Sequence, residues 1–141
     1  MTRPILTLGI CPGSPGGWAV AYNSALLATH GTARDAEGRD AAIRTAVAMA
    51  IFDDARLRVA VLEGAEEAGP RWLEALEGAG YAAKAVLTVP VKRAWTAALG
   101  VALPTEPPWV RDAACVALWA AGVLEGRWQP GERLRGEEGW R

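Results

Sequence analysis

Reactive side chains stand at the ends of apolar segments in this 141-residue sequence. The first such segment ends at Cys11, and a later one, Val-Ala-Val-Leu-Glu, ends at Glu63. Asp112 and Cys115 lie one helical turn apart at the start of the last apolar segment. If these segments meet at one edge of a sheet, their thiols and carboxylates share a crevice, which is a usual location for a site. The alternative is that Glu63 is an ordinary polar end to a strand.

The elements that would position these groups follow from the spacing of apolar residues. Five apolar runs predict strands over Ile5–Ile10, Gly17–Tyr22, Ala25–His30, Arg58–Glu63 and Lys84–Val89. Helical spacing predicts helices over Asp40–Phe52, Pro70–Glu77 and Val110–Leu124, and a short helix or turn over Val91–Leu99. This order predicts an α/β domain with a mixed five-stranded sheet, three antiparallel strands followed by two parallel ones, flanked by helices.

Connecting segments and boundaries come from polar residues, prolines and glycines. Asp40 is the predicted N-cap of the first helix, so Thr32–Gly38 is interpreted as a polar loop. Pro104–Pro108 is interpreted as a rigid extended linker. Residues 1–126 form the predicted domain, and residues 127–141, rich in Gly, Arg and Glu, a flexible extension. Four tryptophans in or beside apolar segments are predicted to be core residues: Trp72, Trp95, Trp109 and Trp119.

The bulk composition is that of a globular protein. Apolar residues make up 51% of the sequence and charged residues 22%, and no apolar run approaches the roughly 18 residues of a membrane span. The start of the sequence does not read as a secretory signal, so we expect a cytoplasmic protein without a membrane partner. The net charge of −1 counts against a strongly basic nucleic-acid binder, although a local basic stripe is compatible with it.

Four motifs occur in one order between residues 5 and 124. They are GICPG with GWAV (residues 9–13 and 17–20), VAVLE (59–63), VKRAWTAALG (91–100) and RDAACVAL (111–118). They resemble, in turn, the G-I-D-P-G opening, the fourth strand with its terminal acid, the V-K segment and the D-A-A-D helix start of RuvC-type Holliday-junction resolvases. The resemblance implies an RNase H-like fold.

The same resemblance implies an activity. RuvC-type enzymes are homodimers that hydrolyse phosphodiesters of four-way DNA junctions with two Mg²⁺ ions (or Mn²⁺) held by four carboxylates. By position, the ligands correspond here to Cys11, Glu63, Asp112 and Cys115. Only Glu63 and Asp112 are acidic, so these two are the implied metal ligands. Three basic residues are the implied phosphate contacts, each of which could equally be a solvated surface charge: Lys92, Arg93 and Arg111.

The two cysteines are the main departure from this pattern. Thiolate is a soft ligand that favours zinc and suits Mg²⁺ poorly, so we expect weakened metal binding and impaired cleavage. Three explanations stay open: a degenerate nuclease that retains its fold and junction binding, a zinc site or disulfide involving both cysteines, or two small buried residues. We favour the first and third together. Rescue by Glu66 or Glu67 is a lesser option.

Two further features bear on function. The segment after Glu63 lacks the aromatic residue that resolvases commonly insert at the junction, and the helix predicted at Pro70–Glu77 is short for a dimer-forming helix. The resemblance implies a homodimer, and the short helix counts against it. The alternative function from a different class is a non-catalytic DNA-binding or assembly module on the same scaffold.

Overall fold

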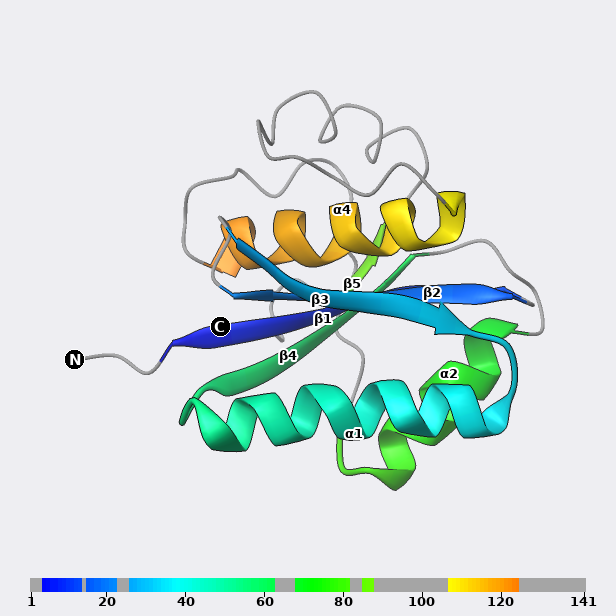
Figure 1. Ribbon diagram of the computed structural model, residues 1–141, viewed down its shortest axis with the longest axis horizontal. Coiled ribbons are helices and arrows are strands. Elements are labelled where there is room, and N and C mark those ends of the chain that lie inside the picture. Colours follow the sequence, from blue (N-terminus) through cyan, green and yellow to red (C-terminus); the bar gives the residue numbers. More distant parts are fainter. Residues whose placement is uncertain are drawn as a thin grey trace.

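The computed structural model describes residues 4–13, 15–22, 26–62, 68–81, 85–87 and 107–124. Within these residues the strands are β1 (Ile5–Cys11), β2 (Gly16–Tyr22), β3 (Leu26–Ala33), β4 (Arg56–Leu62) and β5 (Ala85–Leu87). The helices are α1 (Ala36–Phe52), α2 (Ala68–Gly78) and α4 (Pro108–Leu124). Figure 1 shows their arrangement, with α4 on one side of the strands and α1 and α2 on the other.

The described strands form one mixed sheet in the order β3-β2-β1-β4-β5. β1 pairs antiparallel with β2, and β2 antiparallel with β3. β4 lies parallel to β1 on its other side, and the three residues of β5 pair parallel with β4. The α/β architecture predicted from the sequence is confirmed. Because β1 and β4 run parallel, their carboxyl ends meet at the same edge of the sheet.

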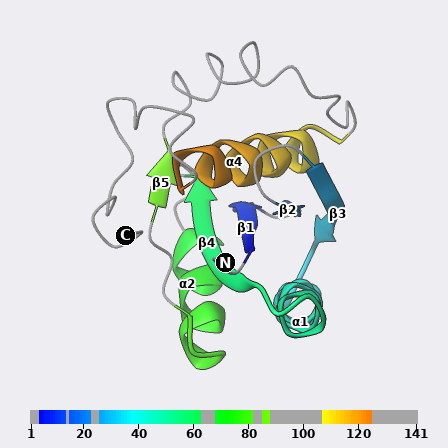
Figure 2. The same ribbon diagram turned by 90° about the vertical axis from the view of Figure 1, so that its left-hand side faces the viewer.

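The two faces of β1 serve two cores, because successive side chains of a strand point to opposite faces. Leu6, Leu8 and Ile10 are fully buried in a core shared with α1 and α2. Gly9 and Cys11 alternate with them and face α4. Figure 2 shows the molecule from the left-hand side of Figure 1, with α4 on one face of the sheet and α1 and α2 on the other.

Between Ala113 and Ala121, α4 is apolar on all sides and every residue is buried. A helix of this kind is stable only in a protein interior. It lies very close to β1: a Cβ atom built on Gly9 would overlap the Ala113 carbonyl oxygen and the Ala117 nitrogen, and would lie 2.8 Å from the Ala117 Cβ. Those are mostly backbone atoms that cannot move aside, so position 9 requires glycine.

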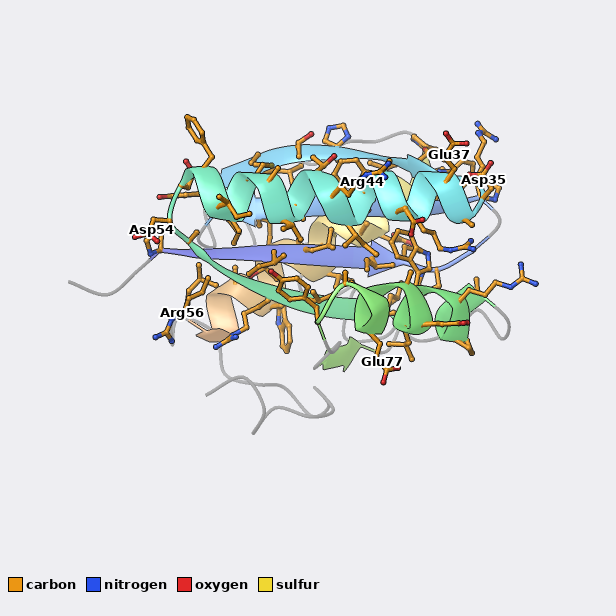
Figure 3. The ribbon with its side chains drawn as sticks, turned by 90° about the horizontal axis from the view of Figure 1, so that it is seen from below. Asp35, Glu37, Arg44, Asp54, Arg56 and Glu77 are labelled. Carbon is orange, nitrogen blue, oxygen red and sulfur yellow. The ribbon has the colours of Figure 1, made fainter. Side chains whose placement is uncertain are left out.

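The start of α1 differs from the prediction. The helix begins at Ala36, and the side chain of Asp35 caps it by accepting a 2.8 Å hydrogen bond from the Gly38 nitrogen. Asp40, the predicted N-cap, lies inside the helix, and β3 continues to Ala33, so the predicted loop over Thr32–Gly38 is wrong. Figure 3 shows Asp35 and Glu37 together at this end of α1 and Asp54 at the other end. The first turn is exposed, so no apolar periodicity marked it as helical.

The start of α4 differs in the same way. The helix begins at Pro108, where the prediction had the end of an extended linker. The nitrogens of Val110 and Arg111 donate to the Pro107 carbonyl oxygen at 3.0 and 3.2 Å. Proline suits the first position of a helix because its missing N–H has no partner there in any case. The helix therefore begins two residues earlier than the sequence indicated.

The remaining sequence predictions fall partly beyond the described residues. The segment Val91–Leu99 and the extension 127–141 lie outside them. No helix in the described part of the chain is both long and apolar enough to cross a membrane.

Candidate functional site

A row of three residues crosses the sheet at the edge where β1 and β4 end. Cys11 of β1 pairs with Gly17 of β2, and Gly17 pairs with Thr32 of β3. Residues paired across neighbouring strands point to the same face. The three positions, here called the terminal row, therefore all face α4.

The first turn of α4 is seated on the terminal row. A Cβ atom on Gly17 would overlap the Trp109 carbonyl oxygen and lie 2.8 Å from the Val110 nitrogen, so the helix backbone rests directly on this glycine. One strand further, the Trp109 indole Nε1 donates a 3.0 Å hydrogen bond to the Thr32 hydroxyl. The sheet edge thus holds the helix start at two neighbouring points.

Cys11, the third member of the row, is half-buried beside α4. It packs against the cluster formed by β2 and α4, which consists largely of alanine side chains. Its surroundings are those of a small apolar residue. The structure holds both Cys11 and Cys115 as thiols rather than as a disulfide.

Asp112 lies in the second turn of α4, which begins at Pro108, and 16% of its side chain is exposed. Its Oδ1 is 3.6 Å from the Nε of Arg111, whose own side chain is 44% exposed. An ion pair this open to solvent contributes at most about 1 kcal/mol to stability. The pair places a positive charge beside the carboxylate that the sequence assigned to metal binding.

Cys115 lies on a different side of α4. Ala113 and Ala117 form the contact with Gly9, so they mark the side of the helix that faces β1. Cys115 is two residues from each, and a helix of 3.6 residues per turn places it about 160° around the axis from both. Cys115 is also 1% exposed. Cys115 belongs to the alanine-rich cluster against which Cys11 packs, but its position on the helix directs it away from β1.

The predicted partners Glu63, Lys92 and Arg93 lie outside the described residues. Leu62, which precedes Glu63, ends β4 at the sheet edge of the terminal row, since Val61 pairs with Ile10. Among the described residues, no group of three His, Cys, Asp or Glu side chains could hold a metal ion.

These observations test whether the chain suits the metal pair that the resemblance implies. At the two cysteine positions sulfur replaces the oxygen that Mg²⁺ prefers, and Cys115 is directed away from β1. Arginine also stands beside Asp112. The described residues do not fit a two-magnesium centre, nor do they combine the two thiols as a zinc site would require.

Thr32 and Trp109 were not recognised as a pair from the sequence. Thr32 was assigned to a loop and Trp109 to the general core, and 77 positions separate them. A hydrogen bond between residues so far apart follows from the strand register and the seating of α4. No local pattern signals it.

Comparisons with known proteins bear on the fold. No model of a known protein family matches the chain, and no curated protein is similar to it in sequence. The structure is similar to one described as T. thermophilus RuvC in complex with Holliday junction substrate, with a TM-score of 0.54 and 16% sequence identity. The match covers 92% of this chain and 99% of that chain. This chain therefore has a RuvC-like α/β fold of the RNase H-like kind.

Proposed function

We propose that this chain binds branched DNA, four-way junctions in particular, and that its metal-dependent phosphodiester hydrolysis is weak or lost. Two observations support the proposal together. The similar RuvC structure is a complex with a Holliday junction and matches nearly the whole length of both chains. The strand-end position that the resemblance assigns to a metal ligand holds Cys11, packed against alanines.

The impairment follows from the donors that remain. Glu63 and Asp112 are the two carboxylates with which this chain would hold Mg²⁺ or Mn²⁺. In such nucleases these ions supply an activated water and stabilise the developing charge. Two carboxylates bind these hard ions less tightly than four, because each lost oxygen donor is also a lost negative charge. The Arg111 guanidinium beside Asp112 opposes a nearby cation further.

DNA binding does not depend on those donors. Arg111 is well exposed in the first turn of α4, and we propose it as one phosphate contact. Lys92 and Arg93 are the further contacts we propose. Phosphate contacts give affinity that falls steeply with salt, so a protein with small net charge still binds DNA through a few well-placed cations.

A competition gel shift tests the binding proposal. Purified full-length chain is titrated into a labelled four-way junction at about 50 and 150 mM salt, with unlabelled linear duplex of the same sequence as competitor. We expect the junction complex to survive an excess of duplex that removes linear complexes, and affinity to fall between the two salt concentrations. Equal competition by junction and duplex would count against any junction role.

A titration with Mn²⁺, followed by calorimetry, tests the impairment separately. The chain is expected to show no saturable site at sub-millimolar Mn²⁺ and no bound zinc after purification. A stoichiometric site that Glu63→Gln removes would contradict the impairment. The alternative, a purely non-catalytic binding or assembly module, shares these outcomes and is favoured by the burial of Cys115 away from β1.

A further inference from the structure

The two contacts of Trp109 lie on paired positions of neighbouring strands. Its backbone carbonyl rests on Gly17, and its indole donates to Thr32, the cross-strand partner of Gly17. Adjacent strands are about 4.8 Å apart. One contact fixes how near the helix lies to the sheet, whereas two contacts this far apart also fix its rotation about its own axis.

Rotation of α4 decides where Arg111 points. Arg111 is two residues from Trp109, so it lies about 160° around the helix from the indole side. When Trp109 is held against the sheet, Arg111 is consequently directed away from it, which agrees with its 44% exposed side chain. A change in rotation would move the guanidinium along the surface.

We propose that Thr32 and Trp109 are positioning residues whose hydrogen bond orients the first turn of α4, so that Arg111 meets a DNA phosphate. This inference rests on the proposed junction binding. Neither residue needs to touch DNA: the bond is partly buried between α4 and β3. Removing it leaves the Gly17 contact in place and lets the first turn rotate.

The salt dependence of junction binding separates this role from a merely structural one. Each phosphate contact contributes about −0.9 to the slope of log affinity against log salt. Arg111→Met is expected to reduce the magnitude of that slope by about one. Thr32→Val, which keeps the side-chain shape but removes the acceptor, is expected to reduce it by up to the same amount and to weaken binding about threefold to tenfold.

Matched variants keep the test interpretable. Thr32→Ser retains the hydroxyl and should keep the unaltered slope. Thr29 lies on the same strand and pairs with Val20, which faces the α1 and α2 core. Thr29→Val should therefore also leave the salt dependence of junction binding unchanged. Trp109→Phe removes the indole N–H donor and takes the place of Thr32→Val in the test if Thr32→Val does not fold. In the Arg111→Met background, Thr32→Val should have no further effect, because the contact it orients is already gone.

Each outcome decides the inference. A reduced slope with Thr32→Val, restored by Thr32→Ser and absent when Arg111 is already replaced, supports it. An unchanged slope, or effects of Thr32→Val and Arg111→Met that add, overturns it while junction binding stands. If the unaltered chain shows no preference for the junction, the proposed function fails and the inference fails with it.

Discussion

Among single residues, Cys11 and Cys115 occupy different environments, although the family resemblance assigns both to metal-ligand positions. Cys11 is half-buried at a strand end, whereas Cys115 is fully buried and lies about 160° from the side of α4 that contacts Gly9. The spacing of Asp112 and Cys115 indicated a shared helix side. Which way that side points depends on how Gly9 and Gly17 seat the helix, which no local pattern reveals.

Replacing each cysteine by aspartate should therefore have unequal effects. Cys115→Asp puts a carboxylate into a fully buried apolar cluster and is expected to lower the free energy of unfolding by about 3 kcal/mol or more. Cys11→Asp, at a half-buried strand end, should cost clearly less. Urea unfolding of both variants measures the difference. Equal losses would contradict the separate environments assigned to the two thiols.

Gly17 provides a second test at this scale. In Gly17→Ala the new methyl group meets the backbone of Trp109 and Val110, which cannot yield without moving α4. We expect a loss of roughly 1–3 kcal/mol of stability, as for other overpacked sites. Gly69→Ala is the control, because nothing lies within 4 Å of a Cβ at that position of α2. It should remain within about 0.5 kcal/mol of the unaltered protein, and a larger loss than for Gly17→Ala would refute the close contact.

At the scale of elements, sequence patterns predicted the elements better than their ends. The apolar runs of β1, β2 and β4 and the apolar α4 were recognisable because burial selects their side chains directly. The starts of α1 and α4 were missed, since an exposed first turn such as residues 36–39 carries polar residues that resemble a loop. Helix starts are set by capping and by neighbouring backbone, which apolar spacing does not report.

The cap of α1 can be tested directly. Asp35→Ala removes the acceptor of the Gly38 N–H and is expected to cost about 1 kcal/mol. Asp40→Ala, at the position that the sequence favoured as the cap, lies within the helix and should change stability little. Thermal unfolding of the two variants side by side decides between the positions. A larger effect at Asp40 would contradict the observed helix start.

At the scale of the whole molecule, the fold followed from the order of elements and the four motifs, and the similar RuvC structure agrees with it. The site was predicted less completely. Cys11 ends β1 at the expected edge of the sheet, Cys115 is directed away from β1, and Glu63 lies outside the described residues. Motif order constrains topology, whereas the orientation of one side chain depends on packing between elements.

A cleavage assay distinguishes a junction that is bound from one that is cut. A four-way junction labelled on one strand is incubated with excess protein in Mn²⁺, under conditions where the gel shift shows the junction fully bound, and products are resolved on a denaturing gel. We expect a bound but essentially intact junction, with no difference between the unaltered chain and Glu63→Gln. Rapid nicking by the unaltered chain, abolished by Glu63→Gln, would contradict it.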